Sequence, residues 1–319
     1  MSRPLIFALP SKGRLKDQTE AWLADCGVGL RVSGGARGYQ ASLDGFEGVE
    51  VRLTSAADIA AALAAGEVHL GVTGEDLLRE DGGEALLLLA LGFGRADLVV
   101  AAPRSWIDVE TMADVDEVAH DILVRTGRRL RVATKYAMQT RAFFAAHGLA
   151  DYRIVDSAGA TEGAPAAGAA ELVVDITTTG ATLAANGLKP LSDGLILNSQ
   201  ARLAASARAE WDAGRLELAR GLLAVFEARA KGRATVSLGW PQTDDERARG
   251  ALAALAKTGR IAGGTLIDRA ELFAAMASLA AAGIGPVTVG EPVYVFEAAC
   301  ESADRLAGAV SSSGSAQAL

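Results

Sequence analysis

The chain has 319 residues, of which 50% are hydrophobic and 22% are charged, a composition typical of a globular protein with about two domains. Its 31 Lys and Arg residues are outnumbered by 39 Asp and Glu residues, and the net charge of −8 argues against binding to nucleic acid or to an anionic membrane. Cys26, Cys300 and the three histidines lack the spacing of metal ligands or of a disulfide scaffold, so neither is expected.

The apolar runs of the sequence are short. Residues 5–9 are followed by Lys12, which leaves too short an apolar core for a signal peptide. The longest run, 85–91, is far below the roughly 18 residues that a membrane-spanning helix needs. We therefore expect a soluble, cytoplasmic protein in a reducing compartment.

Short apolar runs alternate with helical patterns over the first part of the chain. The predicted strands are 5–9, 49–53, 68–72, 99–102, 131–133, 153–155 and 172–176. Helical patterns follow most of them, for example 16–26, which ends at Gly27, and 56–65, which ends at Gly66. Strands that alternate with helices indicate parallel α/β sheets.

Two interdomain crossings are predicted, at 101–103 and at Lys189-Pro190. A helix over 200–231 is expected to complete the first domain, with a linker at 231–233. The remaining pattern predicts a small α+β module with a strand at 235–238, helices at 243–257 and 269–282, and a strand pair within 287–296. The serine-rich end is expected to be disordered.

The stretch 171–187 carries the strongest chemical signal, because a buried strand ends there in an aspartate and a Thr/Gly loop then opens a helix. Free amides and the positive dipole end at a helix start suit a phosphate. Hydroxyl groups add donors and a glycine permits close approach of the backbone. The loop residues are Thr177, Thr178, Thr179, Gly180, Ala181 and Thr182. Asp175 could accept hydrogen bonds from sugar hydroxyls, and Glu171 shares its face of the strand. The alternative is a Thr-rich turn that only caps a helix.

Further turns at predicted strand ends are rich in glycine, threonine and basic residues. They contain Lys12, Gly13 and Arg14; Thr73 and Gly74; Arg95; and Lys135 and Tyr136. Each turn alone fits a solvated helix start. Because the carboxyl ends of strands in open α/β sheets border the ligand crevice, the set together indicates a cleft for a phosphorylated small molecule.

Six segments in this order resemble ATP phosphoribosyltransferase, the first enzyme of histidine biosynthesis, and most closely its short-form catalytic chain. They are LPSKGRL (9–15), GVTGEDLL (71–78), LGFGRADLVVAAP (91–103), VATKYAMQTRAFF (132–144), GATEGAP (159–165) and ELVVDITTTGATLAANGLK (171–189). The resemblance implies an α/β fold with a two-lobed core like type II periplasmic binding proteins, followed by a small C-terminal α+β domain. The implied domains are lobe I (1–102 and 190–230), lobe II with the phosphate loop (103–189), a regulatory or oligomerisation module (231–300) and a disordered tail (301–319).

The resemblance also implies a reaction in which N1 of ATP attacks C1 of phosphoribosyl pyrophosphate (PRPP), with Mg²⁺ required. It assigns Arg37, Arg14 and Lys12 to catalysis, as cations around the leaving pyrophosphate. It assigns to PRPP binding Glu171, Asp175, Thr177, Thr178, Thr179, Gly180, Ala181 and Thr182. It assigns to ATP or phosphate binding Gly13, Thr73, Gly74, Arg95, Lys135, Tyr136 and Glu162. No metal ligand is expected from the chain. A second family arginine is absent from the stretch 53–59, and Arg52 is the nearest candidate to replace it.

The expected partners are ATP and PRPP, a second copy of the chain, and a histidyl-tRNA-synthetase-like regulatory subunit. Two roles stay open for the C-terminal module, feedback inhibition by L-histidine and oligomerisation without an effector. Two alternatives to the enzyme also stay open. One is a two-lobed solute-binding protein without catalysis. The other is a different phosphoribosyltransferase, although such enzymes usually have two adjacent acidic residues before the phosphate loop, whereas Ile176 follows Asp175 here.

Overall fold

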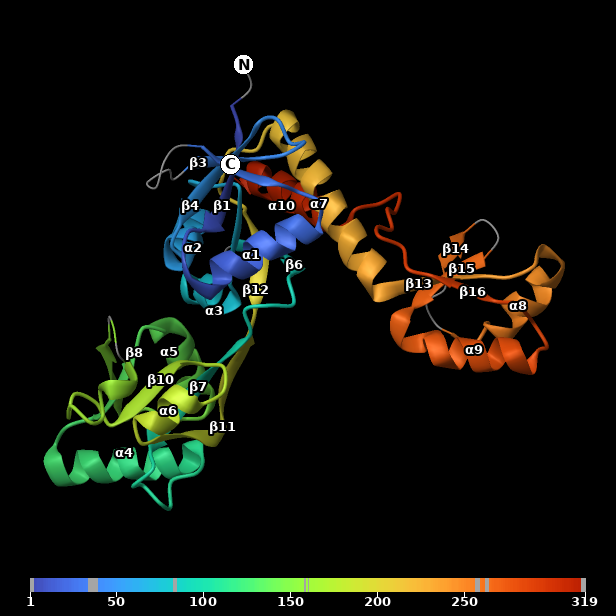
Figure 1. Cartoon of the computed structure of the whole chain (residues 1–319). Coiled ribbons are helices and arrows are strands. Elements are labelled where there is room, and N and C mark those ends of the chain that lie inside the picture. Colours follow the sequence, from blue (N-terminus) through green and yellow to red (C-terminus); the bar gives the residue numbers. More distant parts are fainter. Residues whose placement is uncertain are drawn as a thin grey trace. The chain divides into compact units, whose positions relative to one another are not determined.

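The computed structural model describes residues 3–33, 40–82, 85–157, 159, 161–255, 259–261 and 264–316. The chain forms two compact units (Figure 1). Unit 1 consists of Met1–Trp22, Leu30–Trp211 and Gly308–Leu319, and unit 2 of Leu23–Gly29 and Asp212–Ala307. Within the described ranges, no helix has the length and apolar character needed to cross a bilayer.

The first sheet of unit 1 has seven strands. In order across the sheet they are β2 (Leu30–Ser33), β3 (Gln40–Leu43), β4 (Val49–Thr54), β1 (Leu5–Pro10), β5 (Leu70–Gly74), β12 (Ala201–Ser206) and β6 (Ala85–Ala90). Strands β4, β1 and β5 are parallel, whereas β12 is antiparallel to both neighbours. Helices follow the three parallel strands, namely α1 (Gly13–Asp25), α2 (Ala56–Ala65) and α3 (Glu75–Glu80). Ser55 caps α2 by accepting a hydrogen bond from the Asp58 amide, and Gly66 ends it in the left-handed conformation.

The second sheet of unit 1 has five strands. In order they are β11 (Leu188–Ser199), β7 (Ala96–Pro103), β10 (Leu172–Thr177), β8 (Leu130–Thr134) and β9 (Tyr152–Asp156). Strands β10, β8 and β9 are parallel, and β7 is antiparallel to β10 and β11. Its other elements are α4 (Met112–Thr126), α5 (Ala137–Ala146), the 3₁₀ turn η1 (Thr161–Gly163) and the short α6 (Ala181–Ala185). Leu98, Val132, Val174, Tyr136 and Phe144 belong to its core.

Both sheets share a pattern of five strands: three parallel strands, then an antiparallel strand that has just arrived from the other sheet, then one more strand. The first sheet has β2 and β3 in addition, paired antiparallel at the edge of β4. The chain enters the second sheet at β7 and returns to the first at β12. The predicted α/β class with a two-lobed core is therefore confirmed.

The crossings differ in position from the prediction. Strands β7 and β11 pair with each other along their length, so the second sheet spans Ala96 to Ser199 rather than 103–189. The segment from Ala201 to Ser206 is β12 and not the start of a helix, because it is buried between β5 and β6. Its Ala-rich sequence has a helical composition that pairing with two neighbours overrides.

Unit 2 contains a third, antiparallel sheet of four strands. In order they are β14 (Gly259–Ile261), β15 (Gly264–Asp268), β13 (Thr235–Gly239) and β16 (Thr288–Gly290). The helical elements between them are η2 (Gln242–Asp244), α8 (Asp245–Ala251), η3 (Arg269–Glu271) and α9 (Leu272–Ala281). Val236, Leu238, Ile267 and Leu279 are buried in its core. The predicted α+β module is confirmed.

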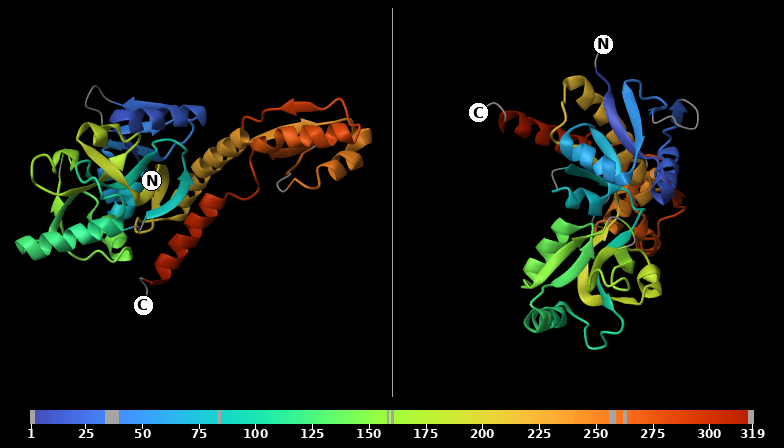
Figure 2. Two further views of the ribbon diagram at one scale, coloured as in Figure 1. Left: turned by 90° about the horizontal axis from the view of Figure 1, so that it is seen from below. Right: turned by 90° about the vertical axis from the view of Figure 1, so that its left-hand side faces the viewer.

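Two long helices flank this sheet in the sequence. Helix α7 (Ala213–Ala234) begins at the cap Asp212 and runs directly into β13 (Figure 2), and it groups with unit 2 rather than with the first lobe. The prediction of a disordered tail over 301–319 is wrong for Glu301–Ala316, which form helix α10. Ala303 and Leu306 are buried there, and this packing outweighs the weak helix propensity of the serine-rich sequence.

Candidate active site

The loop after β10 is shaped by its own threonine hydroxyls. The Gly180 amide donates to Thr177 Oγ1 at 2.8 Å, and the Ala181 amide donates to Thr179 Oγ1 at 3.4 Å. Gly180 has a φ of +73°, and a Cβ placed on it would have no neighbour within 4 Å. Glycine is therefore favoured here by the left-handed backbone conformation and not by a lack of space for a side chain.

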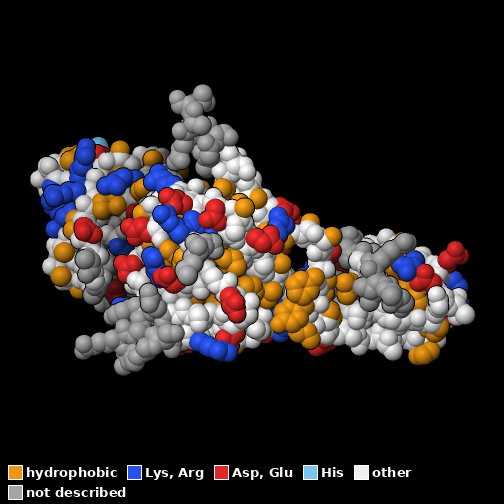
Figure 3. Space-filling model, turned by 90° about the horizontal axis from the view of Figure 1, so that it is seen from above, with side chains coloured by type: hydrophobic (Ala, Val, Ile, Leu, Met, Phe, Trp, Pro, Cys, Tyr) orange, Lys and Arg blue, Asp and Glu red, His pale blue; other side chains and the backbone are white. Residues whose placement is uncertain are grey.

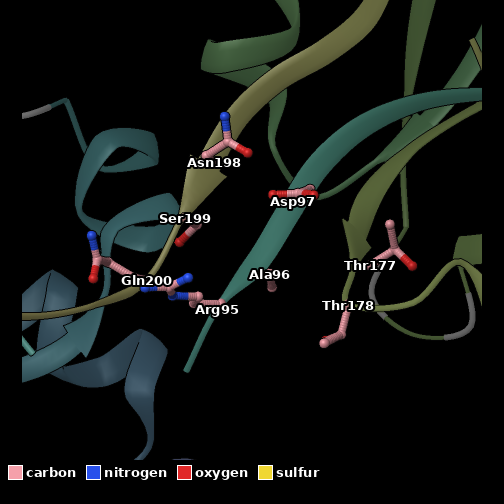
Figure 4. A pocket seen from close by; sticks show the side chains of 8 residues that line it. All are labelled: Arg95, Ala96, Asp97, Thr177, Thr178, Asn198, Ser199 and Gln200. Carbon is pink, nitrogen blue, oxygen red and sulfur yellow. The ribbon is translucent and has the colours of Figure 1, made fainter. Parts of the chain in front are cut away.

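This loop borders a cavity of about 490 Å³ within unit 1. The lining residues are Arg95, Ala96, Asp97, Thr177, Thr178, Asn198, Ser199 and Gln200. Sheet register brings them together, since Asp97 pairs with Thr177 on one side and with Asn198 on the other. Figure 4 shows Thr177 and Thr178 on one side of the strand of Ala96 and Asp97, and Asn198, Ser199 and Gln200 on its other side. Sequence analysis missed Asp97 and Asn198-Ser199-Gln200, although a polar run at a strand end was a usable signal.

A basic residue of the first lobe reaches the loop. Arg14 Nη2 lies 3.5 Å from Thr178 Oγ1, although the two residues are 164 positions apart. Arg14 is in the first turn of α1 and exposed, as is Lys12 just before it. On the face drawn in Figure 3, basic side chains are intermixed with acidic ones. Binding of an anion to this acidic chain therefore depends on local groups such as Arg14 and Arg95.

Lys12 lies within electrostatic reach of the turn between β4 and α2. The pKa of Asp58 is lowered there, first by hydrogen bonds from Ser55 and Thr54 and to a smaller extent by the charge of Lys12. Arg52 Nε donates to Glu50 Oε1 at 3.2 Å, and Arg52 lines a second cavity of about 440 Å³ together with Thr54 and Asp58 of this turn. The structure therefore does not bring Arg52 to the Thr-lined cavity.

Asp175 sits among charged groups at the end of β10. Its Oδ1 accepts a hydrogen bond from the Ile176 amide at 2.8 Å. Burial raises the pKa of Asp175. The hydrogen bond from the Ile176 amide and the charge of Lys135 oppose this shift, whereas the charges of Glu162 and Asp76 add to it. The charges of Lys135 and Glu162 therefore both act on Asp175.

Glu171 does not join this group. Its carboxylate accepts hydrogen bonds from Arg131 Nη2 at 2.7 Å and Arg128 Nη1 at 3.0 Å. It precedes β10, whereas the Thr loop follows the strand. Two residues four apart share a strand face but lie about 13 Å from each other, which separates Glu171 from the loop.

Three other predicted ligand residues turn out to have internal partners. Thr73 is fully buried, and its hydroxyl donates to the Ala56 carbonyl at 2.7 Å. Gly74 leaves room for the Asp76 carboxylate, because a Cβ at residue 74 would clash with Asp76 Oδ1 at 2.3 Å. Tyr136 is fully buried, and its hydroxyl donates to Asp76 Oδ2 at 2.7 Å. None of the three lines the cavity. Arg37 lies outside the described residues.

The family model and the curated relatives name one family. The protein-family model described as ATP phosphoribosyltransferase matches residues 55–223. A Caulobacter vibrioides protein named ATP phosphoribosyltransferase is 64% identical over 318 residues, which are 98% of this chain and 99% of that protein. A Bradyrhizobium sp. protein of the same name is 57% identical over 235 residues, 72% of each chain. Among solved structures, an ATP phosphoribosyl transferase (HisG:HisZ) complex from Thermotoga maritima has 24% identity and a TM-score of 0.48, covering 63% of this chain and 87% of that chain. By the family match and the near full-length identity, the chain belongs to the ATP phosphoribosyltransferase family.

Proposed function

We propose that the chain transfers the phosphoribosyl group of PRPP to N1 of ATP, with release of pyrophosphate, as the first step of L-histidine biosynthesis. The observation that carries this proposal is the 64% identity to an ATP phosphoribosyltransferase over nearly the whole chain. The site supports it independently, since a Thr-rich loop and basic side chains converge on one cavity. A solute-binding protein would not be expected to show that identity.

The loop Thr177–Thr182 is the proposed site for the 5-phosphate of PRPP. Its hydroxyls and the amides from Gly180 onward supply neutral donors, and Arg14 beside Thr178 supplies positive charge. Thr182 is exposed, and its hydroxyl has no hydrogen-bond partner among the described residues, which leaves it available to a ligand. Asp175 is the proposed acceptor for ribose hydroxyls.

Cations around the cavity are the proposed stabilisers of the leaving group. Pyrophosphate leaves C1 with several negative charges, and fixed positive charges that meet it lower the barrier. Arg14 and Arg95 are placed for this role, and Lys12 and Lys135 lie at neighbouring turns. Arg37 stays a prediction for the same role. Adenine N1 already has a lone pair, so the reaction does not require a strong general base.

Mg²⁺ fits this site only as an ion shared with substrate. The residues that the structure describes contain no group of three or more His, Cys, Asp or Glu side chains that could hold a metal. Mg²⁺ commonly binds one or two protein carboxylates together with substrate phosphates, and the candidates beside the loop are Asp97, which lines the cavity, and Asp175. When bound, Mg²⁺ would neutralise charge on the pyrophosphate. Orientation of PRPP then depends on the Thr loop and the basic residues.

The test is turnover by the purified chain with ATP, PRPP and Mg²⁺, with product followed by absorbance or mass. The expected result is phosphoribosyl-ATP and pyrophosphate in equal amounts. Tight PRPP binding with no product, also in the presence of a histidyl-tRNA-synthetase-like subunit, would favour a binding protein instead. Activity with a nucleobase in place of ATP would favour a different phosphoribosyltransferase.

The α+β module of unit 2 is proposed to serve regulation or assembly. Its four-stranded sheet has a buried core of its own, so it is a folded module rather than an extension of the catalytic lobes. The same assay with added L-histidine separates the two roles. Inhibition would assign effector binding to the full chain, whereas unchanged turnover together with a dimer or larger species in solution would assign assembly.

A further inference from the structure

A buried carboxylate ties the two lobes of unit 1 together. Asp76, in α3 of the first lobe, is 7% exposed. Its Oδ2 accepts the Tyr136 hydroxyl at 2.7 Å, and its Oδ1 accepts the Ser199 hydroxyl at 2.7 Å. Tyr136 belongs to the turn between β8 and α5, and Ser199 is the last residue of β11. We call Asp76, Tyr136 and Ser199 the Asp76 latch.

Backbone contacts around the Asp76 latch strengthen the same junction. The Met138 amide donates to Glu80 Oε1 at 2.7 Å, and the Gln139 amide donates to Glu80 Oε2 at 3.2 Å. The Gln139 side-chain amide donates to the Asp76 carbonyl at 2.8 Å. The Glu80 carboxylate thus caps the first turn of α5, and the Asp76 carbonyl holds the Gln139 side chain, so that the two helices are fixed against each other.

The position of the Asp76 carboxylate requires a residue without a Cβ at position 74. Gly74 has a φ of −73°, which is accessible to any residue, so the glycine is not required by the backbone. Instead, a Cβ on Gly74 would lie 2.3 Å from Asp76 Oδ1, inside van der Waals contact. The Asp76 carboxylate therefore leaves no room for a side chain at residue 74.

Both donors of the Asp76 latch lead to the active site. Ser199 lines the cavity beside Asp97 and the Thr loop. Lys135, the neighbour of Tyr136, has its Nζ 5.0 Å from the centroid of the Tyr136 ring, and its charge acts on Asp175. Burial, followed by the charge and hydrogen bond of Asp76, raises the pKa of Tyr136 well above its usual range, so the phenol remains a donor.

We propose that Asp76 is a positioning residue for the transferase reaction: it holds Ser199 and the Lys135-Tyr136 turn at fixed positions relative to the PRPP loop. The energetic basis is that each carboxylate oxygen is buried with one hydroxyl donor from the second lobe. Removal of a donor leaves a desolvated charge unpaired, and the lobes then adjust to recover solvent or another partner. This proposal rests on the proposed function for its kinetic readout but not for its structural one.

The variants are Tyr136→Phe and Ser199→Ala, which each remove one hydroxyl, together with the double variant. Ser199→Thr keeps a hydroxyl and serves as the conservative variant. Tyr152→Phe is the matched control, because Tyr152 belongs to the same sheet, packs on Phe144, and has a hydroxyl without a hydrogen-bond partner in the described part of the chain. Each of the four substitutions changes the side-chain volume by no more than about one heavy atom, so loss of packing is small.

The kinetic readout is the KM for PRPP of the folded protein with Mg²⁺ and saturating ATP. We expect Tyr136→Phe and Ser199→Ala each to raise the KM for PRPP about tenfold. The double variant should raise it by less than the product of the two effects, and Ser199→Thr should have a KM close to that of the parent. A loss of stability alone would lower the active fraction without raising KM. Unchanged KM in both single variants would overturn the proposal.

The structural readout needs no activity. Spin labels at Asp17→Cys in α1 and Glu117→Cys in α4 occupy exposed sites on the two lobes, and the native cysteines are buried. We expect a broader distance distribution in Tyr136→Phe and Ser199→Ala than in the parent or in Tyr152→Phe. Identical distributions would contradict the latch. If the parent protein formed no product, the proposed function would fail, and these distances would still decide the role of Asp76.

Discussion

Burial disfavours the charge of Asp175, whereas its proposed role as acceptor for ribose hydroxyls needs that charge. Burial raises its pKa, so the ionised form costs folding free energy at pH 7, and this cost disappears once pH falls below the unfolded pKa of about 3.9. Asp175→Asn is therefore expected to raise the thermal midpoint at pH 7, with the gain fading toward pH 4. The same variant should raise the KM for PRPP about tenfold or more, because a charged acceptor is lost.

The control for Asp175 is Asp156→Asn. Asp156 lies at the end of β9, a position similar to that of Asp175 near the end of β10. Unlike Asp175 it is exposed, and it has no hydrogen bond or ion pair with the described residues. It should change neither quantity. A stabilising effect of Asp175→Asn that persisted unchanged at pH 4 would contradict burial as its cause.

A substitution at Thr182 tests phosphate binding without disturbing the structure of the loop. Thr177 and Thr179 hydroxyls accept backbone amides, so their loss also disturbs the loop, whereas the Thr182 hydroxyl has no such task within the described chain. Thr182→Ala should raise the KM for PRPP about tenfold, as expected for one charge-assisted hydrogen bond, and leave the thermal midpoint unchanged. Thr126→Ala, at an exposed helix end of the same lobe, should leave KM unchanged. An unaltered PRPP affinity in Thr182→Ala would remove Thr182 from the phosphate site.

The short helix α6 is flanked by two glycines that make a matched pair. Gly180 and Gly187 have φ of +73° and +69°, and a Cβ on either would meet no atom within 4 Å. Gly→Ala at either position should destabilise the fold by about 1 kcal/mol, since alanine resists the left-handed conformation. Only Gly180→Ala should also raise the KM for PRPP. Equal kinetic effects of both variants would show that α6 as a whole, and not its first turn, matters to binding.

Elements with a clear apolar period were predictable, and those defined by a distant partner were not. The helix predicted at 56–65 is observed as α2, and the strand predicted at 172–176 is observed as β10 with one further residue. In contrast, β12 and α10 have helix-like and disorder-like compositions, and their states are set by burial against remote segments. Sequence period reports which face is apolar but not what will cover it.

The candidate site was predicted in part for the same reason. The Thr loop and Arg14 were recognisable because glycine, hydroxyl and basic residues gather at a strand end, and the structure brings them together. Thr73, Gly74 and Tyr136 belong to similar turns but serve the fold. Thr73 bonds to Ala56, 17 positions away, Tyr136 bonds to Asp76, 60 positions away, and Gly74 lies against the Asp76 side chain. The direction of each side chain, which the sequence does not show, decides whether a turn residue serves the fold or the site.

In unit 2, a long-range ion-pair cluster joins the end of α1 to α7. Arg229 contacts both oxygens of Asp25, with Nε 3.0 Å from Oδ2 and Nη2 2.8 Å from Oδ1, and Arg233 Nη2 lies 2.8 Å from the same Oδ1. Arg229 also donates to the Val293 carbonyl at 2.8 Å. Arg229 therefore links Asp25, helix α7 and the segment of Val293, which are more than 60 residues apart in sequence.

This link makes the stability of unit 2 sensitive to acid. The hydrogen bond from Arg229 is the largest cause that lowers the pKa of Asp25, so its stabilisation is present above the unfolded pKa of about 3.9 and is lost as pH falls through the lower folded pKa. Asp25→Asn should cost roughly 1–3 kcal/mol at pH 7, because it weakens charge-assisted hydrogen bonds, and the difference from the parent should shrink below about pH 4. Urea unfolding at several pH values measures both. Asp17→Asn, exposed in the same helix, should show neither effect, and a pH-independent loss in Asp25→Asn would instead assign Asp25 a packing role.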